Sequence, residues 1–334
     1  MLTDRLAALT ADGAQPDGAD VAHFGDPAGE LQAARAGAAH ADLLRHENLH
    51  LHGAAAVAYL DRLTKLKVSA LPVGGASPAF FLDARGRVEA GAWLLRRGDD
   101  DLLALCAPGQ AEPLRALLDR YHFGEAICFE PAEGGHWRTI LGPKAPEALA
   151  AIGWPVPPQG ALAHHEWGVL ARTDRLGPHT YDAWIHDAAW ATVRAQLTGA
   201  GAVETGAHTL LAARLLAGAA AHPHEYGPHG SPLEIGMAGI TDGKGCYPGQ
   251  EVIERTLALG KPARALRRLT LSGPAAVGTS LLRDGKPAGL LTSAVALPDG
   301  QWIGLGLIKR SLADDPAPFQ VEQATAHIIQ EPPL

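Results

Sequence analysis

The sequence predicts an α+β protein of several domains, and three observations lead to this fold class. Segments with the apolar spacing of helices alternate with strand-like segments up to about residue 260. After Lys261-Pro262 the texture changes, and residues 264–330 hold short β segments separated by turn signals such as Asp284-Gly285. The chain has 334 residues, enough for two or three domains. Mixed α and β structure followed by β structure alone is typical of α+β proteins.

The first 65 residues contain two predicted helices and one predicted strand. Residues 1–22 have weak periodicity, and we interpret them as a loose start. Residues 28–39 contain helix formers at amphipathic spacing, and residues 48–53 alternate apolar and polar side chains as a strand does. Residues 54–65 place leucines on one face and predict a second helix.

The next segments predict consecutive strands and then an alternation of strands and helices. Further strands are expected over residues 80–82, 88–96, 102–106, 137–141, 166–173 and 180–185. Further helices are expected over residues 109–121, 144–152, 188–198 and 206–217. We expect Asp187 to be the N-cap of the helix over 188–198 and Gly218 to end the last one. Residues 222–232, rich in His, Pro and Gly, predict a loop.

The composition argues against two classes of partner. The formal net charge of −8 is unsuited to extended contacts with nucleic-acid phosphates. No apolar run reaches the roughly 18 residues of a membrane helix, and the N-terminal segment lacks the features of a signal peptide. The three cysteines, Cys106, Cys128 and Cys246, are too far apart for a disulfide framework. We therefore expect a cytoplasmic protein that binds neither nucleic acid nor membranes.

Residues 244–255, Lys-Gly-Cys-Tyr-Pro-Gly-Gln-Glu-Val-Ile-Glu-Arg, are the most informative stretch. Cys246 lies between Gly245 and Gly249, which indicates a bent loop that other groups can approach closely. Lys244 precedes the thiol and Arg255 follows it, and either cation would favour the thiolate. We therefore expect a functional thiol, although a free cysteine is often a buried, inert residue.

Three other side chains of this stretch have simpler explanations as well. Tyr247 either contributes to the site or packs against a neighbouring strand. Gln250 and Glu251 either take part in chemistry or hold the loop through its backbone amides. Glu251 would oppose thiolate formation unless it pairs with Arg255.

The stretch resembles the K-G-C-[FY]-x-G-Q-E-x-x-x-R signature of the YgfZ family, the folate-binding relatives of the glycine-cleavage aminomethyltransferase (T-protein). All fixed positions of the signature are met. Weaker similarities occur in the same order as in that superfamily, from about residue 23 to 310. They lie at residues 23–37, 177–186, 214–218, 232–234 and 286–293. Thr180 and Leu216 depart from the pattern, because they stand where glycine and glutamate are usual.

The resemblance implies a T-protein-like multidomain fold with two mixed α/β domains and a small C-terminal β-barrel. A discontinuous folate-binding domain would cover residues 1–46 and 135–260. Residues 47–134 would form a domain inserted into it, and residues 261–334 would form the barrel.

The resemblance also implies a cofactor and a function. Tetrahydrofolate or another reduced folate would bind in a central cavity near Tyr181, Asp182, Arg214 and Glu234. Cys246 would lie at the rim and act with Lys244. The family is associated with assembly or repair of iron–sulfur enzymes and with tRNA modification, so iron–sulfur client or assembly proteins are the expected partners. From the residues alone, Asp182 and Arg214 also suit a polar strand face and a helix surface.

One departure separates two members of the superfamily. Aminomethyltransferases carry a G-G-x-x-D-D stretch whose aspartate handles methylene transfer, whereas residues 86–91 here read Gly-Arg-Val-Glu-Ala-Gly. Glu89 is displaced by one position, which would turn it to the opposite face of a strand. A tetrahydrofolate-dependent aminomethyltransferase is therefore the first alternative function. A folate-independent scaffold for a client enzyme is the second.

The remaining titratable residues predict no metal site. His222, His224 and His229 have loose zinc-like spacing without a complete tetrahedral set. His50 and His52 share one strand face, and we interpret them as core or surface histidines. The apolar surroundings of Cys106 and Cys128 predict inert core thiols.

Overall fold

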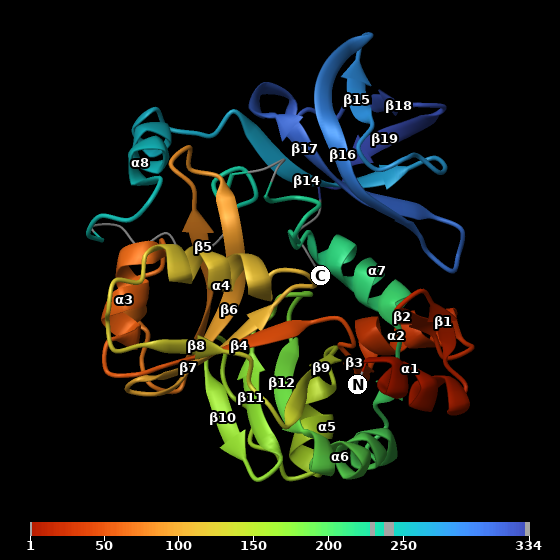
Figure 1. Cartoon of the computed structure of the whole chain (residues 1–334). Helices are drawn as coiled ribbons and strands as arrows, with labels where there is room; N and C mark the ends of the chain where they lie inside the picture. The colour runs from red at the N-terminus through yellow and green to blue at the C-terminus, as the bar shows by residue number, and fades with distance from the viewer. Residues whose placement is uncertain (1, 228–230, 237–243, 331–334) are drawn as a thin grey trace.

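The structure is a computed structural model, and it describes residues 2–227, 231–236 and 244–330. Its strands form a five-stranded sheet, a six-stranded sheet, a closed barrel and one small two-stranded sheet. In Figure 1 the barrel lies above the two large sheets, and helix α7 runs directly beneath it.

The five-stranded sheet is antiparallel, with the strand order β5-β6-β7-β4-β8. Its strands are β4 (Glu47–His52), β5 (Gly75–Leu82), β6 (Val88–Gly98), β7 (Asp101–Cys106) and β8 (Cys128–Glu130). Helices α3 (Ala56–Leu63) and α4 (Ala111–Arg120) cover one face of this sheet. A 3-10 helix, Val68–Ala70, follows α3.

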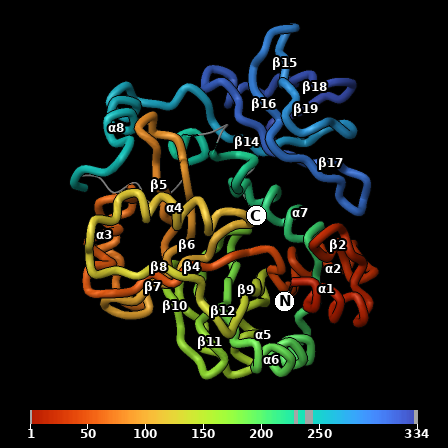
Figure 2. The backbone as a smooth tube through the Cα atoms, viewed as in Figure 1, coloured from red at the N-terminus to blue at the C-terminus, as the bar shows by residue number. Residues whose placement is uncertain are grey.

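The six-stranded sheet joins an early strand of the chain to strands from the middle, in the order β10-β11-β12-β9-β3-β13. Its strands are β3 (Ala39–Asp42), β9 (Gly135–Leu141), β10 (Leu162–His165), β11 (Gly168–Arg172), β12 (Tyr181–His186) and β13 (Val203–Glu204). Strand β3 pairs with the much later β9, and Figure 1 labels the two next to each other. Figure 2 traces the same view as a tube, with the N-terminal part of the chain in red. Helices α5 (Ala145–Ala151) and α6 (Asp187–Gly199) cover one face of this sheet.

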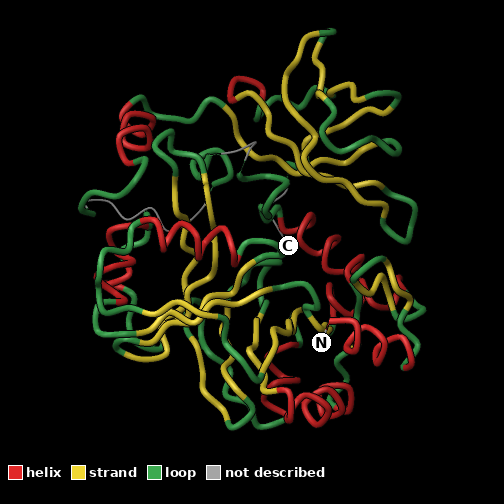
Figure 3. The backbone as a smooth tube through the Cα atoms, in the orientation of Figure 1, coloured by secondary structure: helices red, strands yellow, loops and turns green. Residues whose placement is uncertain are grey.

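The uncovered faces of the two large sheets pack against each other. Leu95, Leu103 and Leu105 of one sheet meet Trp137 and Trp184 of the other in a single buried cluster. The result is four layers, with two sheets in the middle and helices on the outside, as Figure 3 shows by colour.

The N-terminal segment is ordered, so the prediction of a loose start over residues 1–22 was wrong. It forms α1 (Leu2–Ala11) and the hairpin of β1 (Gln15–Asp17) and β2 (Asp20–His23). Leu9 and Val21 are buried against Leu44, a partner from a later segment that local periodicity does not reveal. Helix α2 (Pro27–Ala36) comes next in the chain, and it packs against the much later helix α7 (Ala207–Ala217).

The C-terminal strands form a closed antiparallel barrel in the order β14-β17-β16-β15-β18-β19. They are β14 (Arg264–Leu271), β15 (Ser280–Arg283), β16 (Lys286–Ala296), β17 (Trp302–Lys309), β18 (Phe319–Val321) and β19 (Ala324–Ile328), with a 3-10 helix at Arg310–Leu312. Leu215 of α7 packs against Leu297 and Leu305, which seats the barrel on this helix. The predicted α+β class with a C-terminal barrel is confirmed. The three-domain boundaries stay a prediction.

Two local expectations need correction. Asp187 is the first residue of α6, after the N-cap His186, and its carboxylate bonds His136 Nδ1 at 2.6 Å. The second half of the cysteine stretch is helix α8 (Gln250–Ala258), where we expected only a bent loop.

The expected loop over 222–232 lies partly outside the described residues. In the described part of the chain, no helix combines the length and apolarity needed to cross a bilayer.

Candidate functional site

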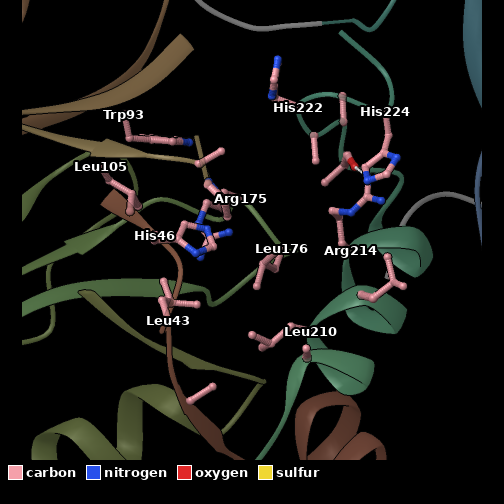
Figure 4. Close-up of a pocket in the computed structure, with 18 of the residues that line it drawn as sticks. Leu43, His46, Trp93, Leu105, Arg175, Leu176, Leu210, Arg214, His222 and His224 are labelled. Carbon is pink, nitrogen blue, oxygen red and sulfur yellow. Dashed lines mark hydrogen bonds between the residues drawn. The ribbon is translucent and has the colours of Figure 1, made fainter. Parts of the chain in front are cut away.

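A cavity of about 570 Å³ lies where the two large sheets meet α7. Its wall is mostly apolar and includes Phe80, Trp93 and Tyr226. In Figure 4, His46 and Arg175 lie together on one side of this space, and Arg214 comes from α7 on the other. A mostly apolar cleft with a few converging polar groups is typical of a small-molecule site.

Asp182 holds Arg175, one of the polar residues that line the cavity, in place. Asp182 lies on β12 and is fully buried, with its side chain away from the helix-covered face. Its carboxylate accepts from Arg175 Nε at 2.9 Å, from Arg175 Nη2 at 2.8 Å and from Thr173 Oγ1 at 2.6 Å. Arg175 therefore stands between Asp182 and the cavity as a fixed, planar donor.

His46 lies beside Arg175 in the cavity. Burial lowers the pKa of this imidazole well below its usual value of 6.5, and the nearby Arg175 and Arg45 lower it further. His46 is therefore neutral at physiological pH. One ring nitrogen can donate a hydrogen bond and the other can accept one.

Arg214 lines the cavity, but hydrogen bonds within the protein hold its guanidinium. It donates to Glu225 Oε2 at 2.7 Å, to Ser293 Oγ at 2.8 Å and to the carbonyl oxygen of Ala219 at 2.9 Å. Ser293 also donates to Glu225 Oε1 at 2.6 Å. This buried network joins α7 to strand β16 of the barrel, so contact between Arg214 and a ligand stays a prediction.

Two other predicted ligand residues lie outside the cavity wall. Tyr181 points into the core under α5 and α6, where burial raises the pKa of its hydroxyl. Glu234 forms a two-pronged ion pair with Arg264, at 2.9 Å from Nε and 2.8 Å from Nη2. This pair connects the segment before the cysteine stretch to the first barrel strand.

Three acids also line the cavity. Asp42 pairs with Arg138 at 3.5 Å and with Arg5, and Asp174 pairs with Arg172 at 3.1 Å. Burial raises the pKa of the third, Asp20.

The expected aspartate pair has no counterpart on strand β6. Glu89 is the unpaired residue of a β-bulge opposite Phe81 and Leu82, and its carboxylate accepts from Arg120 Nη2 of α4 at 2.7 Å. Gly91 and Trp93 face the cavity instead. Glu89 is thus directed toward the helix layer, as its displaced position predicts.

The cysteine stretch is anchored next to the cavity while its thiol stays in solvent. Cys246 is exposed, which confirms the expectation of an accessible thiol. The neighbouring Tyr247 is buried in one cluster with Phe80 and Tyr226, two residues of the cavity wall. Burial raises the pKa of Tyr247 to about 12.

Both predicted partners of the thiol are bonded to other groups. Lys244 Nζ donates to the carbonyl oxygens of Thr64 and, at 2.5 Å, of Leu66, so it ties the loop to the segment after α3. Burial lowers the pKa of this ammonium to about 8. Arg255 pairs with Glu251 at 2.7 Å on the exposed face of α8. Activation of the thiol by either cation stays a prediction.

Gly249 lets the loop reach the tip of the β5–β6 hairpin (Figure 1). Its φ is +78°, in the left-handed region. A Cβ at this position would lie 2.5 Å from the carbonyl oxygen of Asp83 and 3.1 Å from the Cα of Gly86. Gly249 is therefore needed for this contact, and Gln250 begins α8 directly after it.

Two predictions about cysteines differ in outcome. Cys106 is buried, as expected, but Cys128 is exposed on the edge strand β8, so the expectation that it is a core thiol was wrong. Only the side chain of Phe129 on this short strand packs toward the core. Of the three loop histidines considered for zinc, His229 lies outside the described residues.

Sequence reasoning missed His46, Trp93 and Arg175 as cavity residues, as it missed the three acids described above. Each occurs singly in an ordinary stretch of sequence, and only the packing of the two sheets brings them together. Arg175, which lies seven residues before the predicted acid Asp182, is the one member that a search for charge partners would have suggested.

Comparisons with known proteins agree with this architecture. No family model matches the chain. A protein of Arabidopsis thaliana, named as a candidate transferase of the chloroplast, is 24% identical over 309 residues, covering 87% of this chain and 70% of that protein. An aminomethyltransferase of Deinococcus deserti is 26% identical over 310 residues, covering 88% of this chain and 83% of that enzyme.

The fold itself matches that of a solved structure. The crystal structure of the glycine cleavage system aminomethyltransferase T from Bartonella henselae matches with a TM-score of 0.87 at 18% identity, covering 98% of this chain and 96% of that one. The predicted T-protein-like fold is therefore confirmed. The chain therefore resembles aminomethyltransferase-like proteins in sequence and shares the fold of one of them.

Proposed function

We propose that this protein is a YgfZ-type member of the superfamily, which binds a reduced folate and assists the assembly or repair of iron–sulfur enzymes. One observation carries the proposal. The exposed Cys246 sits on a loop that Tyr247 attaches to the cavity wall. A ligand in the cavity would therefore influence the position of the thiol. Iron–sulfur client or assembly proteins are the corresponding partners, and enzymes of tRNA modification are one class of client.

The cavity suits a reduced folate in size and in chemistry. Its volume of about 570 Å³ falls within the range of roughly 300–1,000 Å³ that holds drug-sized ligands. A pterin ring needs apolar contact on its faces and hydrogen bonds at its edge. Phe80, Trp93 and Tyr226 supply the former. Arg175 and neutral His46 supply donors and an acceptor, and Asp182 acts through Arg175 by fixing its guanidinium.

Calorimetric titration with tetrahydrofolate tests this binding mode. We expect Arg175→Ala and Asp182→Ala to raise Kd by about 10- to 150-fold, because a charge-assisted hydrogen bond contributes about 1.5–3 kcal/mol. Arg267→Ala is the control, since this arginine pairs with the exposed Asp314 on the barrel. Thermal unfolding of each variant verifies the fold. An unchanged Kd in both cavity variants would remove the pair from the site.

The role of the thiol is tested separately in a strain lacking this protein. Cys246→Ser changes an exposed side chain by one atom, so we expect a stability change below about 0.5 kcal/mol and unchanged folate affinity. The variant should nevertheless fail to restore the activity of iron–sulfur enzymes. Full rescue would show that the shape of the loop matters and its thiol does not.

Aminomethyl transfer is the second candidate, because the Deinococcus relative bears that name. The direction of Glu89 counts against it. The third candidate, a folate-independent scaffold, predicts no heat of binding in the same titration.

A further inference from the structure

We propose that His50, His52 and Glu130 form a binding site for a divalent transition-metal ion, with Zn²⁺ as its representative. The three residues come from the adjacent strands β4 and β8. Each offers one ligand atom, and these atoms lie within 4.8 Å of one another. The site is separate from the cavity and does not depend on the proposed folate function.

The alternation of the strands brings the three side chains together. Leu49 and Leu51 of β4 are buried in the core under α3 and α4, so His50 and His52 project from the opposite face. In the antiparallel register, His50 lies opposite Glu130. The two rings stack with centroids 4.3 Å apart, and His52 Nε2 lies 3.3 Å from Glu130 Oε1. Ligand atoms of tetrahedral zinc are about 3.3 Å apart when each lies roughly 2.0–2.1 Å from the metal.

A second carboxylate already holds one of the rings. His50 Nε2 lies 2.8 Å from Asp101 Oδ1 on the neighbouring strand β7. Arg97 donates to the same oxygen at 2.7 Å, which fixes the carboxylate. Metal-binding imidazoles are commonly oriented by such a carboxylate, because it sets the ring orientation and tautomer. Asp101 is therefore a positioning residue of the site.

The ligand set indicates the kind of ion. Two imidazoles and one carboxylate favour Zn²⁺ and similar ions, whereas Mg²⁺ and Ca²⁺ prefer oxygen ligands alone. Three protein ligands leave a coordination position open to water. The side chains of His50, His52 and Glu130 are 27%, 35% and 64% exposed, so an ion can enter from solvent. The bound metal would connect the short edge strand β8 to β4.

The test is a calorimetric titration of the metal-free, full-length protein with ZnCl₂. We expect wild type to bind one equivalent of Zn²⁺. His52→Gln and Glu130→Gln should each raise the Kd of this binding by at least tenfold. Both side chains are partly exposed and the substitutions are similar in size, so the variants should fold. His327→Gln is the matched control, because this histidine is exposed on the barrel strand β19. A hundredfold excess of Mg²⁺ should not compete.

Thermal unfolding gives an independent measurement. Saturating Zn²⁺ should raise the Tm of wild type and His327→Gln, and raise it less in the two site variants, because a ligand of the folded state stabilises it. Binding that is weaker by at least tenfold in both site variants supports the proposal. Undiminished binding in both would place the ion elsewhere, for example at the exposed Cys246, and would overturn the proposal, as would no binding to wild type.

Discussion

At the scale of single residues, the three thiols differ in surroundings and should differ in reactivity. Cys106 is fully buried, and burial raises the pKa of its thiol from 9.0 to about 12, whereas Cys128 and Cys246 are exposed. Three pKa units lower the thiolate fraction about a thousandfold at neutral pH. We therefore expect native alkylation, followed by peptide mass spectrometry, to label Cys246 and Cys128 long before Cys106. Early labelling of Cys106 would contradict its placement.

Lys244 should give the protein a distinct pH dependence. Its ammonium has a pKa of 10.5 in an ordinary setting and of about 8 in the folded protein, because burial disfavours the charge. Between these values the unfolded chain binds more protons, so stability rises as the pH increases from about 8 to 10.5. Below pH 8 the amine is charged in both states and the unfavourable burial is fully present.

Urea unfolding at pH 7.5 and pH 10 measures this effect. From pH 7.5 to pH 10, the free energy of unfolding of wild type should rise by about 1–2 kcal/mol more than that of Lys244→Met, after allowance for solvent screening. Lys261→Met, at an exposed position, serves as the control. Equal pH profiles for wild type and Lys244→Met would show that the amine is not buried as described.

At the scale of elements, Gly249 fixes the contact between the cysteine loop and the β5–β6 hairpin. We expect Gly249→Ala to destabilise the protein by about 1–3 kcal/mol more than Gly260→Ala. Both residues have positive φ, +78° and +97°, but an added methyl group meets the Asp83 carbonyl only at Gly249 and nothing within 4 Å at Gly260. The difference in the free energy of unfolding therefore isolates the contact from backbone strain. Equal losses would exclude a role for the close approach.

The sequence predicted elements well where the periodicity was local. Helices α3 and α4 have apolar side chains at helical spacing, and strands β6 and β7 are apolar segments bounded by turns, so their predicted positions agree with the structure. Short or sparse elements were missed. Strand β8 has three residues, and α8 buries only Ile253, so neither has an apolar pattern that could be detected. Helix α1 buries only Leu9, against residues far along the chain.

The candidate site was predictable only where its residues are contiguous. The cysteine stretch is one short run, so its exposure and its glycine-dependent bend followed from the sequence. The pairing of Asp182 with Arg175 depends on the path of the chain between β11 and β12. The position of His46 beside Arg175 depends on how two sheets face each other. Neither relation leaves a local pattern.

At the scale of the whole molecule, the fold of an aminomethyltransferase is present without the expected acid on β6. We expect no methylene transfer from an aminomethyl carrier protein to tetrahydrofolate, because Glu89 bonds Arg120 outside the cavity and strand β6 lines the cavity with Gly91, Ala92 and Trp93, which carry no acid. An assay of methylenetetrahydrofolate formation, with an authentic T-protein as the positive control, measures this. Turnover of about 1 per second or more would refute the expectation.

The cavity wall draws on residues from Leu9 to Gly236, and no described residue of the barrel belongs to it. During synthesis from the N-terminus, the last wall segment is therefore added to the chain before Arg264, where the barrel begins. An early fragment cannot enclose a ligand, whereas a nascent chain that still lacks the barrel already has the complete lining. The barrel then supplies Ser293, the outer partner of Arg214 and Glu225. The barrel thus completes a buried network behind a cavity whose lining residues all precede it in the sequence.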